Sequence, residues 1–249
     1  MPGSSDRRSV LRSEFERAAP GYSQRTKGRF DNLGATEFSG IRKGDNVLEV
    51  GSGTGHFLAL FERVAERLVG VDLTWAMLAE SRTEHPTQMP VLADGNRLPF
   101  PSQAFDLVTC AQMLHHVWEP VPLLKEMRRV VDAQGRVLVI DQVAPESFEQ
   151  TAFMNELEAL RDPSHATSRS PSAMRIVVQA AGLEILDERI VAGENLLSNW
   201  MWSGEYPPGR IDKVREFIEK FGHETGMEWR QEGDDWVYTY RRIMLLASR

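Results

Sequence analysis

The chain has 249 residues, of which 41% are hydrophobic and 26% are charged, and it carries a net charge of −7 at pH 7. This length is enough to bury the core of one large domain, and the acidic balance argues against binding of DNA or RNA, which requires clustered Lys and Arg. The single cysteine, Cys110, excludes an intramolecular disulfide.

The N-terminal stretch is charged and has no apolar segment of signal-peptide length. No apolar run reaches the roughly 18 residues that a membrane-spanning helix requires. We therefore expect a soluble, cytoplasmic protein without a membrane partner.

The first elements in chain order are helical. Val10, Leu11, Phe15 and Ala18 recur at helical spacing and predict a helix that stops before Pro20 and Gly21. A second helix is expected over residues 30–38.

From residue 46 the sequence pattern changes to short apolar runs that alternate with amphipathic stretches. The pattern predicts a mostly parallel sheet with helices on both faces, an α/β fold. The expected strands cover 46–50, 67–72, 89–94, 105–111 and 135–143, and the expected helices cover 55–66, 75–85 and 119–131.

Beyond residue 145 the pattern loosens. Helices are predicted at 148–161, at 171–181 (after Ser and Pro, before Gly182) and at 211–222, with strands at 183–191 and 235–248. A polar loop, RDPSHATSRS, covers 161–170. Trp200, Trp202 and Tyr206 cluster in the segment 194–210 and predict either a buried cap core or an aromatic wall of a substrate pocket.

A glycine turn follows the first predicted strand. The sequence VLEVGSGTG carries Gly51, Gly53 and Gly55 as GxGxG, preceded by Glu49. Glycines let a ligand approach the backbone, and a following helix would offer free N–H groups. A dinucleotide site would place a third glycine where His56 stands, so the pattern favours a ligand smaller than a pyrophosphate dinucleotide.

Two further acids end the next two predicted strands. Asp72 lies 21 residues after Gly51, where an acid can accept hydrogen bonds from both hydroxyls of a ribose. Asp94, followed by Gly95, can read the exocyclic amine and a ring nitrogen of adenine. An alternative for Asp72 is a helix cap.

Taken in order, four motifs resemble those of the class I S-adenosylmethionine-dependent methyltransferases, and in particular the ubiquinone/menaquinone-biosynthesis group of small-molecule enzymes. The motifs are VLEVGSGTG, VGVDLTWAML, LADGNRLPFPSQAFDLVTC and LHHVWEPVPLLKEMRRVVDAQGRVLVID. The resemblance covers about residues 44–145 and, more weakly, 172–191 and 235–248.

The resemblance implies a Rossmann-like, mostly parallel seven-stranded sheet in a single methyltransferase domain spanning 1–249. Its parts would be an N-terminal helical lid (1–40), a cofactor-binding core (44–145), a region with cap insertions (145–230) and the last strand (235–248). It also implies S-adenosylmethionine as cofactor and a small-molecule acceptor.

The implied roles transfer residue by residue. The glycine turn would lie beside the methionine part of the cofactor, with Glu49 positioning it and Asp72 taking the ribose. The remaining implied contacts are Leu73 and Met77 on the adenine faces, Asp94 and Gly95 at its edge, Cys110, Ala111 and Gln112 on the sulfonium side, and Tyr22 in the lid. Met77 equally fits an ordinary core position.

Candidates for a catalytic base are His115, His165 and Asp141. His115 and His116 are adjacent, which is the wrong spacing for two metal ligands on one helix face, so no metal site is predicted. Either histidine also fits a neutral packing role, and Arg161, Asp162 and His165 fit either a salt-bridged corner or substrate contacts.

Methyl transfer to oxygen, carbon or nitrogen of a small molecule is therefore the expected function. Two alternatives stay open on sequence alone: a protein of this fold that binds the cofactor without transferring methyl, and a nucleotide-dependent oxidoreductase with a degenerate glycine fingerprint.

Overall fold

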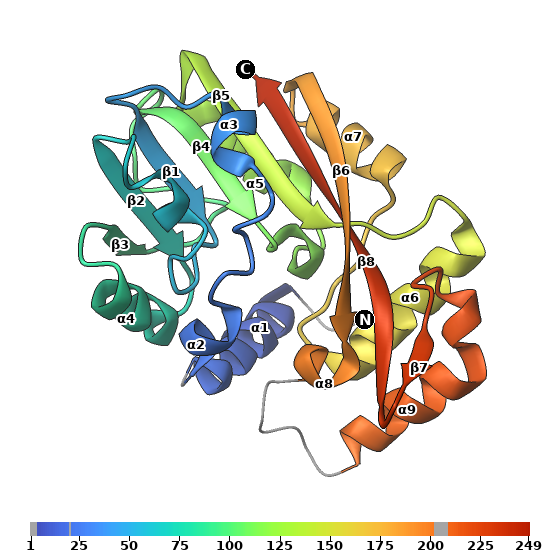
Figure 1. Ribbon diagram of the computed structural model, residues 1–249. Coiled ribbons are helices and arrows are strands. Elements are labelled where there is room, and N and C mark those ends of the chain that lie inside the picture. The colour runs from blue at the N-terminus through green and yellow to red at the C-terminus, as the bar shows by residue number, and fades with distance from the viewer. Residues whose placement is uncertain (1–3, 20, 202–208) are drawn as a thin grey trace.

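The computed structural model describes residues 4–19, 21–201 and 209–249, and the side chains from residue 8 onward within these ranges. Within them, eight strands form one sheet in the order β3-β2-β1-β4-β5-β8-β6, with β7 paired to β8 (Figure 1). The strands are β1 (Asn46–Val50), β2 (Arg67–Asp72), β3 (Met89–Leu92), β4 (Phe105–Ala111), β5 (Val131–Gln142), β6 (Glu184–Leu196), β7 (Arg230–Glu232) and β8 (Asp235–Ser248).

Strands β1 to β5 pair in parallel, and β8 runs antiparallel between β5 and β6. The strand order reverses at β1 and β4, so the chain leaves the sheet in opposite directions after these two strands. Ligands of open α/β sheets bind at the carboxyl ends of the strands beside such a reversal. The predicted α/β architecture with a mostly parallel sheet is confirmed.

Helices cover the sheet and its carboxyl edge. In Figure 1, α5 and α7 lie against the sheet, α1 and α2 lie beyond the arrowheads of β1 and β4, and α6, α8 and α9 gather around the far ends of β6 and β8. The helices are α1 (Ser4–Ala18), α2 (Tyr22–Thr26), α3 (Ala35–Ser39), α4 (Trp75–Glu84), α5 (Pro120–Val130), α6 (Phe148–Arg161), α7 (Pro171–Ala180), α8 (Leu197–Trp200) and α9 (Arg210–Phe221), with 3₁₀ turns η1 (Leu58–Phe61), η2 (Leu114–His116) and η3 (Gly222–Glu224). Among the described helices, none is both long and apolar enough to cross a membrane.

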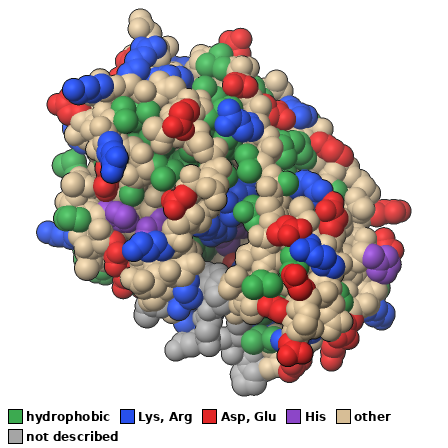
Figure 2. All heavy atoms as spheres, viewed as in Figure 1, with side chains coloured by type: hydrophobic (Ala, Val, Ile, Leu, Met, Phe, Trp, Pro, Cys, Tyr) green, Lys and Arg blue, Asp and Glu red, His purple; other side chains and the backbone are tan. Residues whose placement is uncertain are grey.

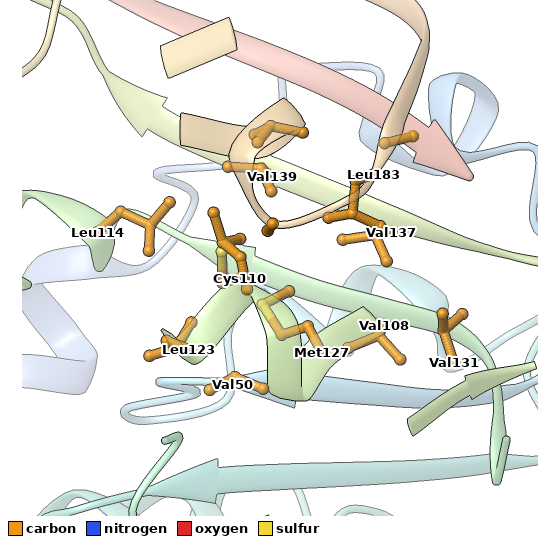
Figure 3. Close-up of a cluster of buried hydrophobic side chains, with 14 of the residues drawn as sticks. Val50, Val108, Cys110, Leu114, Leu123, Met127, Val131, Val137, Val139 and Leu183 are labelled. Atoms are coloured by element: carbon orange, nitrogen blue, oxygen red, sulfur yellow. The ribbon is translucent and has the colours of Figure 1, made fainter. Parts of the chain in front are cut away.

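The main core lies between the sheet and helices α5 and α7. Leu124, Met127 and Val130 of α5 have no exposed surface and pack with the strand side chains shown in Figure 3. Cys110 belongs to this cluster and is 1% exposed. A second cluster lies on the opposite face of the sheet, and a third fills the space between β8, α6, α8 and α9.

Local signals fix several helix ends. Ser147 accepts a hydrogen bond from the Gln150 backbone N–H and begins α6, and Ser170 accepts one from Ala173 and begins α7 with proline in its first turn. These caps satisfy N–H groups that have no partner inside the helix. The predicted helix over 148–161 and the capped helix after Ser170 are therefore confirmed.

The helix predicted over 55–66 is wrong. Only η1 forms there, because backbone bonds alternate between three- and four-residue spacing: Ala59 N–H bonds to Gly55 and Leu60 N–H bonds to Phe57. Phe57, Leu58 and Phe61, each at most 1% exposed, hold this irregular segment against the sheet. The glycine turn thus leads into a tight coil rather than a long helix.

Other differences are smaller. The helix predicted over 30–38 shortens to α3, because Gly34 adopts the left-handed conformation (φ 62°) immediately before it. The third strand ends at Leu92, two residues before Asp94, β6 extends to Leu196, and β7 has no counterpart among the predicted elements.

Candidate functional site

A cavity of about 460 Å³ opens at the carboxyl ends of β1, β2 and β4, and we call it the turn cavity. Its wall brings together segments that are far apart in sequence: the glycine turn, the loops after β2 and β3, and α1 and α2. The predicted cofactor residues that line it are Tyr22, Glu49, Gly51, Gly53, Asp72, Leu73, Met77, Asp94, Gly95 and Gln112, together with Ala111.

The glycine turn owes its shape to positive φ angles. Gly51, Gly53 and Gly55 have φ of 74°, 52° and 82°, values that side chains other than glycine rarely adopt. A Cβ on Gly53 would meet no atom within 4 Å, whereas one on Gly55 would lie 2.3 Å from Gln88 Oε1. Gly53 therefore faces the open cavity, while Gly55, which does not line it, is required for packing behind the turn.

Asp72 ties the turn to the end of β2. Its Oδ2 accepts from the Gly53 N–H at 2.9 Å and its Oδ1 from the Thr74 N–H at 2.8 Å. The helix-cap alternative is not what the structure shows, since Thr74 is the cap residue of α4. Burial, opposed by these hydrogen bonds, raises the pKa of Asp72 above its ordinary value.

Three polar atoms in this wall are buried without a hydrogen-bond partner within the described residues. They are Glu49 Oε2, Ser52 Oγ and Gln112 Nε2. Burial raises the pKa of Glu49 well above its ordinary value, so a cationic ligand group would be needed to keep the carboxylate ionised. An orphaned acceptor and an orphaned donor suit a ligand that is itself both cationic and anionic.

Asp94 is engaged by α1. Its Oδ1 accepts from the backbone and side chain of Asn96, and its Oδ2 forms an ion pair of 2.8 Å with Arg8. The short helix α2 contacts the glycine segment as well, through Ser23, whose carbonyl lies 2.8 Å from His56 Nε2. Segments of the predicted lid region thus lie directly over the turn cavity.

A second cavity, of about 730 Å³, adjoins the first, and we call it the cap cavity. It lies between α1, α2, the loop after α6, and the extended ends of β6 and β8; Figure 2 shows the hollow on this face, with Lys and Arg side chains deep inside it. Six residues line both cavities: Phe15, Tyr22, Thr26, Arg29, Gln112 and His116.

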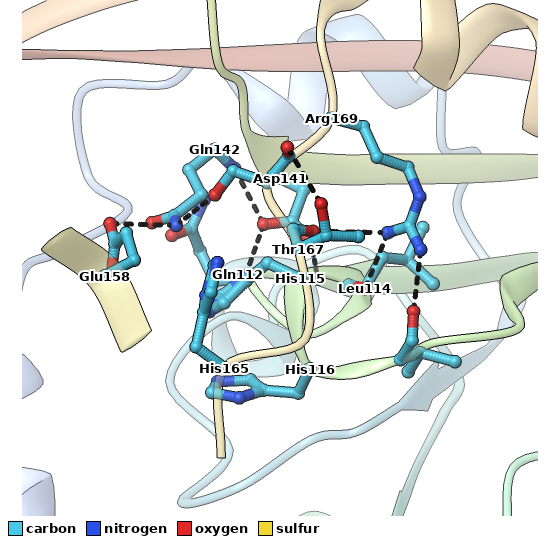
Figure 4. A network of polar contacts seen from close by, with 12 residues as sticks. Gln112, Leu114, His115, His116, Asp141, Gln142, Glu158, His165, Thr167 and Arg169 are labelled. Carbon is cyan, nitrogen blue, oxygen red and sulfur yellow. Dashed lines mark hydrogen bonds and ion pairs between the residues drawn. The ribbon is translucent and has the colours of Figure 1, made fainter. Parts of the chain in front are cut away.

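His115 lines the cap cavity only, and a buried carboxylate stands behind it. Asp141 Oδ1 lies 2.6 Å from His115 Nδ1, and Oδ2 accepts from the His115 backbone N–H at 3.0 Å (Figure 4). Burial raises the pKa of Asp141, but the neighbouring His115 outweighs it, so the net pKa lies below its ordinary value. Nδ1 of His115 therefore donates to an ionised Asp141, which leaves Nε2 as the proton-accepting atom.

Hydrogen bonds from residues 166–169 hold the loop that carries His115. The His115 carbonyl accepts from the backbone N–H groups of Ala166 and Thr167, and Arg169 donates to the carbonyls of Leu114 and Val117 (Figure 4). The His116 ring lies against the His115 ring, with centroids 4.1 Å apart and planes tilted by 43°. Burial lowers the pKa of His116 to about 3, so this second ring is neutral.

The two other predicted catalytic residues line neither the turn cavity nor the cap cavity. Asp141 lies behind His115 and is hydrogen-bonded to it. His165 lines neither the turn cavity nor the cap cavity, because its turn directs it toward α6, where its Nε2 lies 2.8 Å from Asn155 Oδ1. Burial lowers the pKa of His165 to about 4. Arg161 and Asp162 of the same loop do line the cap cavity.

Cys110 also differs from its predicted position on the sulfonium side. Its side chain points into the main core (Figure 3), since alternate residues of β4 face opposite sides of the sheet. Gln112 stands at the boundary of the two cavities with φ 54°. The strand end therefore contributes Ala111 and Gln112, but not Cys110.

The aromatic segment gives a mixed result. Trp200, 7% exposed, packs in the third cluster and also lines the cap cavity, so both interpretations of this residue hold. Trp202 and Tyr206 lie outside the described residues.

Sequence reasoning missed Arg29 and Arg242, two cationic residues of the cap cavity. Arg29 follows α2 in an irregular loop that carries no pattern. Arg242 does carry one: Tyr238, Tyr240 and Arg242 alternate along β8 and line the same cavity. No group of three or more His, Cys, Asp or Glu in the described part of the chain could hold a metal ion.

The comparisons with known proteins agree with this geometry. The family described as "Methyltransferase domain" matches residues 48–139. The uncharacterized methyltransferase YcgJ of Bacillus subtilis is 30% identical over 186 residues, which make up 72% of this chain and 72% of that protein. The chain therefore belongs to the class I S-adenosylmethionine-dependent methyltransferases, as its motifs predict.

Two further similarities concern part of the sequence and the fold. A demethylmenaquinone methyltransferase of Bacillus licheniformis is 36% identical over 114 residues, but these cover only 43% of this chain and 49% of that protein. The crystal structure of YcgJ from Bacillus subtilis superposes with a TM-score of 0.79 at 24% identity, covering 86% of this chain and 96% of that one.

Proposed function

We propose that this methyltransferase binds S-adenosylmethionine in the turn cavity and methylates a small molecule held in the cap cavity. The observation that carries the proposal is the wall shared by the two cavities, in which Gln112 and His116 at the end of β4 meet Phe15 and Tyr22 from the N-terminal helices. A donor and an acceptor placed on the two sides of this wall would meet at Gln112.

The residues of the turn cavity fit this cofactor. The orphaned Glu49 Oε2 suits its cationic groups, Gln112 Nε2 can donate to its carboxylate, and Asp72 can take its ribose hydroxyls. For Asp94 to accept from the adenine amine, its ion pair with Arg8 has to open. The bound cofactor supplies an activated methyl group whose transfer requires alignment rather than strong acid or base.

The protein's remaining task is to orient the acceptor and exclude water. Phe15 and Tyr22 lie over both cavities and would act as the lid. Where the acceptor atom carries a proton, His115 Nε2, oriented by Asp141, is the base that faces the cap cavity. We regard the whole chain as a single methyltransferase domain, with residues 145–230 supplying the cap.

Calorimetric titration tests the cofactor site. Wild-type protein is expected to bind S-adenosylhomocysteine in preference to NAD. Asp72→Ala should bind it about ten- to a hundredfold more weakly, since loss of a charge-assisted bond costs roughly 1.5–3 kcal/mol. Glu219→Ala, an exposed acid on α9, is the control and should leave affinity unchanged.

Because Asp72 also holds the Gly53 N–H, the melting temperature of each variant has to be measured alongside. Unchanged affinity in a folded Asp72→Ala protein, or tighter binding of NAD than of S-adenosylhomocysteine, would contradict the proposal.

A further inference from the structure

The acidic side chains of the cap cavity are all engaged by partners. None of the three acids that line it forms an ion pair with Arg29 or Arg242 within the described residues. Glu14 is paired with Arg17, Glu194 with Arg230 at 2.6 Å, and Asp162 accepts from the Ser164 hydroxyl at 2.6 Å and its backbone N–H at 2.8 Å.

Two guanidinium groups in the same cavity have no such partner. Arg29 donates to Gln112 Oε1 at 3.0 Å, and Arg242 donates to the Arg29 carbonyl at 3.1 Å, so both bonds go to neutral acceptors. Within the described residues, neither arginine forms an ion pair with an acid. Each guanidinium has five N–H groups, so most donors of this pair remain available.

Burial makes this arrangement costly without an anion. Arg242 is 8% exposed, and its guanidinium carbon lies 4.5 Å from the centre of the Tyr240 ring. Burial and then the positive charge of Arg29 lower the pKa of Arg242 to about 10, which still leaves Arg242 charged at neutral pH. Asp141 offsets part of this field, but its oxygens are bonded to His115 and to the Gln142 N–H.

Three aromatic side chains lie in the same cavity as the pair. Trp200, Tyr238 and Tyr240 line it, and so does His115. A pocket that combines these aromatic side chains with the arginine pair and a proton acceptor suits a molecule with an apolar body, an anionic group and a separate nucleophile.

We propose, building on the methyltransferase function proposed above, that the acceptor is an organic carboxylate whose carboxylate is bound by Arg29 and Arg242. A planar guanidinium matches a carboxylate with two parallel N–H···O bonds. The carboxylate fixes the orientation of the acceptor in the cap cavity, and its nucleophilic atom points toward the boundary with the turn cavity, where His115 and Gln112 lie.

Matched pairs of probes test this assignment. Binding of benzoate and benzamide, 2-naphthoate and 2-naphthamide, and hexanoate and hexanamide is measured by calorimetry, with and without saturating S-adenosylhomocysteine. Wild-type protein should prefer the carboxylate over the amide by roughly tenfold or more in at least one pair.

The ratio of carboxylate to amide affinity, rather than the affinity alone, is then measured in variants. Arg242→Gln should abolish the carboxylate preference, Arg29→Gln should reduce it, and Arg242→Lys should restore part of it, because lysine keeps the charge but loses the fork. Arg241→Gln is the matched control: Arg241 is the neighbouring residue of β8, pairs with Glu228 and does not line the cap cavity.

The outcomes separate the two proposals. If S-adenosylhomocysteine binds but no pair shows a carboxylate preference, or if Arg242→Gln keeps it in full, the carboxylate site is wrong. If carboxylates are preferred through Arg242 but S-adenosylhomocysteine does not bind, the methyltransferase proposal fails and the carboxylate site stands.

Discussion

At the scale of single residues, His115 and Asp141 form a hydrogen-bonded pair. Of the two, only His115 lines the cap cavity. The carboxylate is fully engaged by His115 and by the Gln142 N–H, which fixes the imidazole tautomer and ring position. In the function proposed here Asp141 would position His115, and of these two residues only His115 would contact the acceptor. The adjacent His116, with its pKa near 3, stays neutral and does not compete for the proton.

Replacing this histidine should affect turnover and not cofactor binding. With an acceptor atom that carries a proton, we expect His115→Gln to lower the methyl-transfer rate by about 10²- to 10⁴-fold, the usual contribution of a positioned base, with S-adenosylhomocysteine affinity unchanged. Rates are measured with an acceptor recovered from the purified protein by mass spectrometry. His223→Gln, an exposed histidine, is the control. Equal losses of turnover and cofactor affinity in His115→Gln would remove the base role.

His165 lines neither the turn cavity nor the cap cavity, so we expect its replacement to change stability rather than turnover. Its pKa of about 4 in the folded protein lies below the ordinary value of about 6.5, so between these pH values the unfolded chain binds a proton that the folded chain does not. Stability is therefore full above pH 6.5 and is lost as pH falls toward 4.

The size of this effect can be measured by urea unfolding at pH 7.5 and pH 5. Linkage predicts that His165 costs the wild-type protein about 2 kcal/mol between these conditions. His165→Gln should lose less stability by about this amount, because the titrating group is gone. The carboxylates with lowered pKa, Asp141 and Glu158, titrate below this window. Parallel losses in the two proteins would show that His165 is not buried as a neutral ring.

At the scale of elements, the sequence patterns predicted the regular helices and strands but not the irregular backbone after the glycine turn. The buried strands and the helices α5, α6 and α7 follow from apolar periodicity and from caps such as Ser147 and Ser170. The segment after the glycine turn has the same apolar content as a helix and buries Phe57, Leu58 and Phe61, yet its backbone coils irregularly. Periodicity cannot distinguish these outcomes, since both bury the same residues.

The glycine turn supplies a prediction at this scale. Gly53 and Gly233 share a left-handed backbone (φ 52° and 60°) and open space at the Cβ position, but only Gly53 lines the turn cavity. Gly53→Val and Gly233→Val should both lose stability through backbone strain, by about 1–2 kcal/mol or more.

Only Gly53→Val should also lose S-adenosylhomocysteine binding in calorimetry, since its side chain would fill ligand space. If both folded variants bind like the wild type, the turn is not the cofactor site; if both lose binding, the effect is one of general stability.

The whole molecule places its two cavities on either side of one strand end. The reversal of strand order between β1 and β4 opens the turn cavity, and the pairing of β6 and β8 beyond the end of β5 provides a wall of the cap cavity (Figure 1). Most of the residues predicted for the cofactor do line the turn cavity, because ordered motifs carry them, whereas Gly55 and Cys110 do not. Arg29, Arg242 and the inward turn of His165 were not, because they depend on how distant segments meet in three dimensions.

A crystal structure of the protein with S-adenosylhomocysteine tests the central claim most directly. We expect the ligand in the turn cavity, with its ribose at Asp72, its amino-acid end near Glu49 and the glycine turn, and its sulfur directed past Gln112 toward the cap cavity. Ligand density in the cap cavity, or a sulfur facing away from Gln112, would contradict the assignment of the two cavities to donor and acceptor.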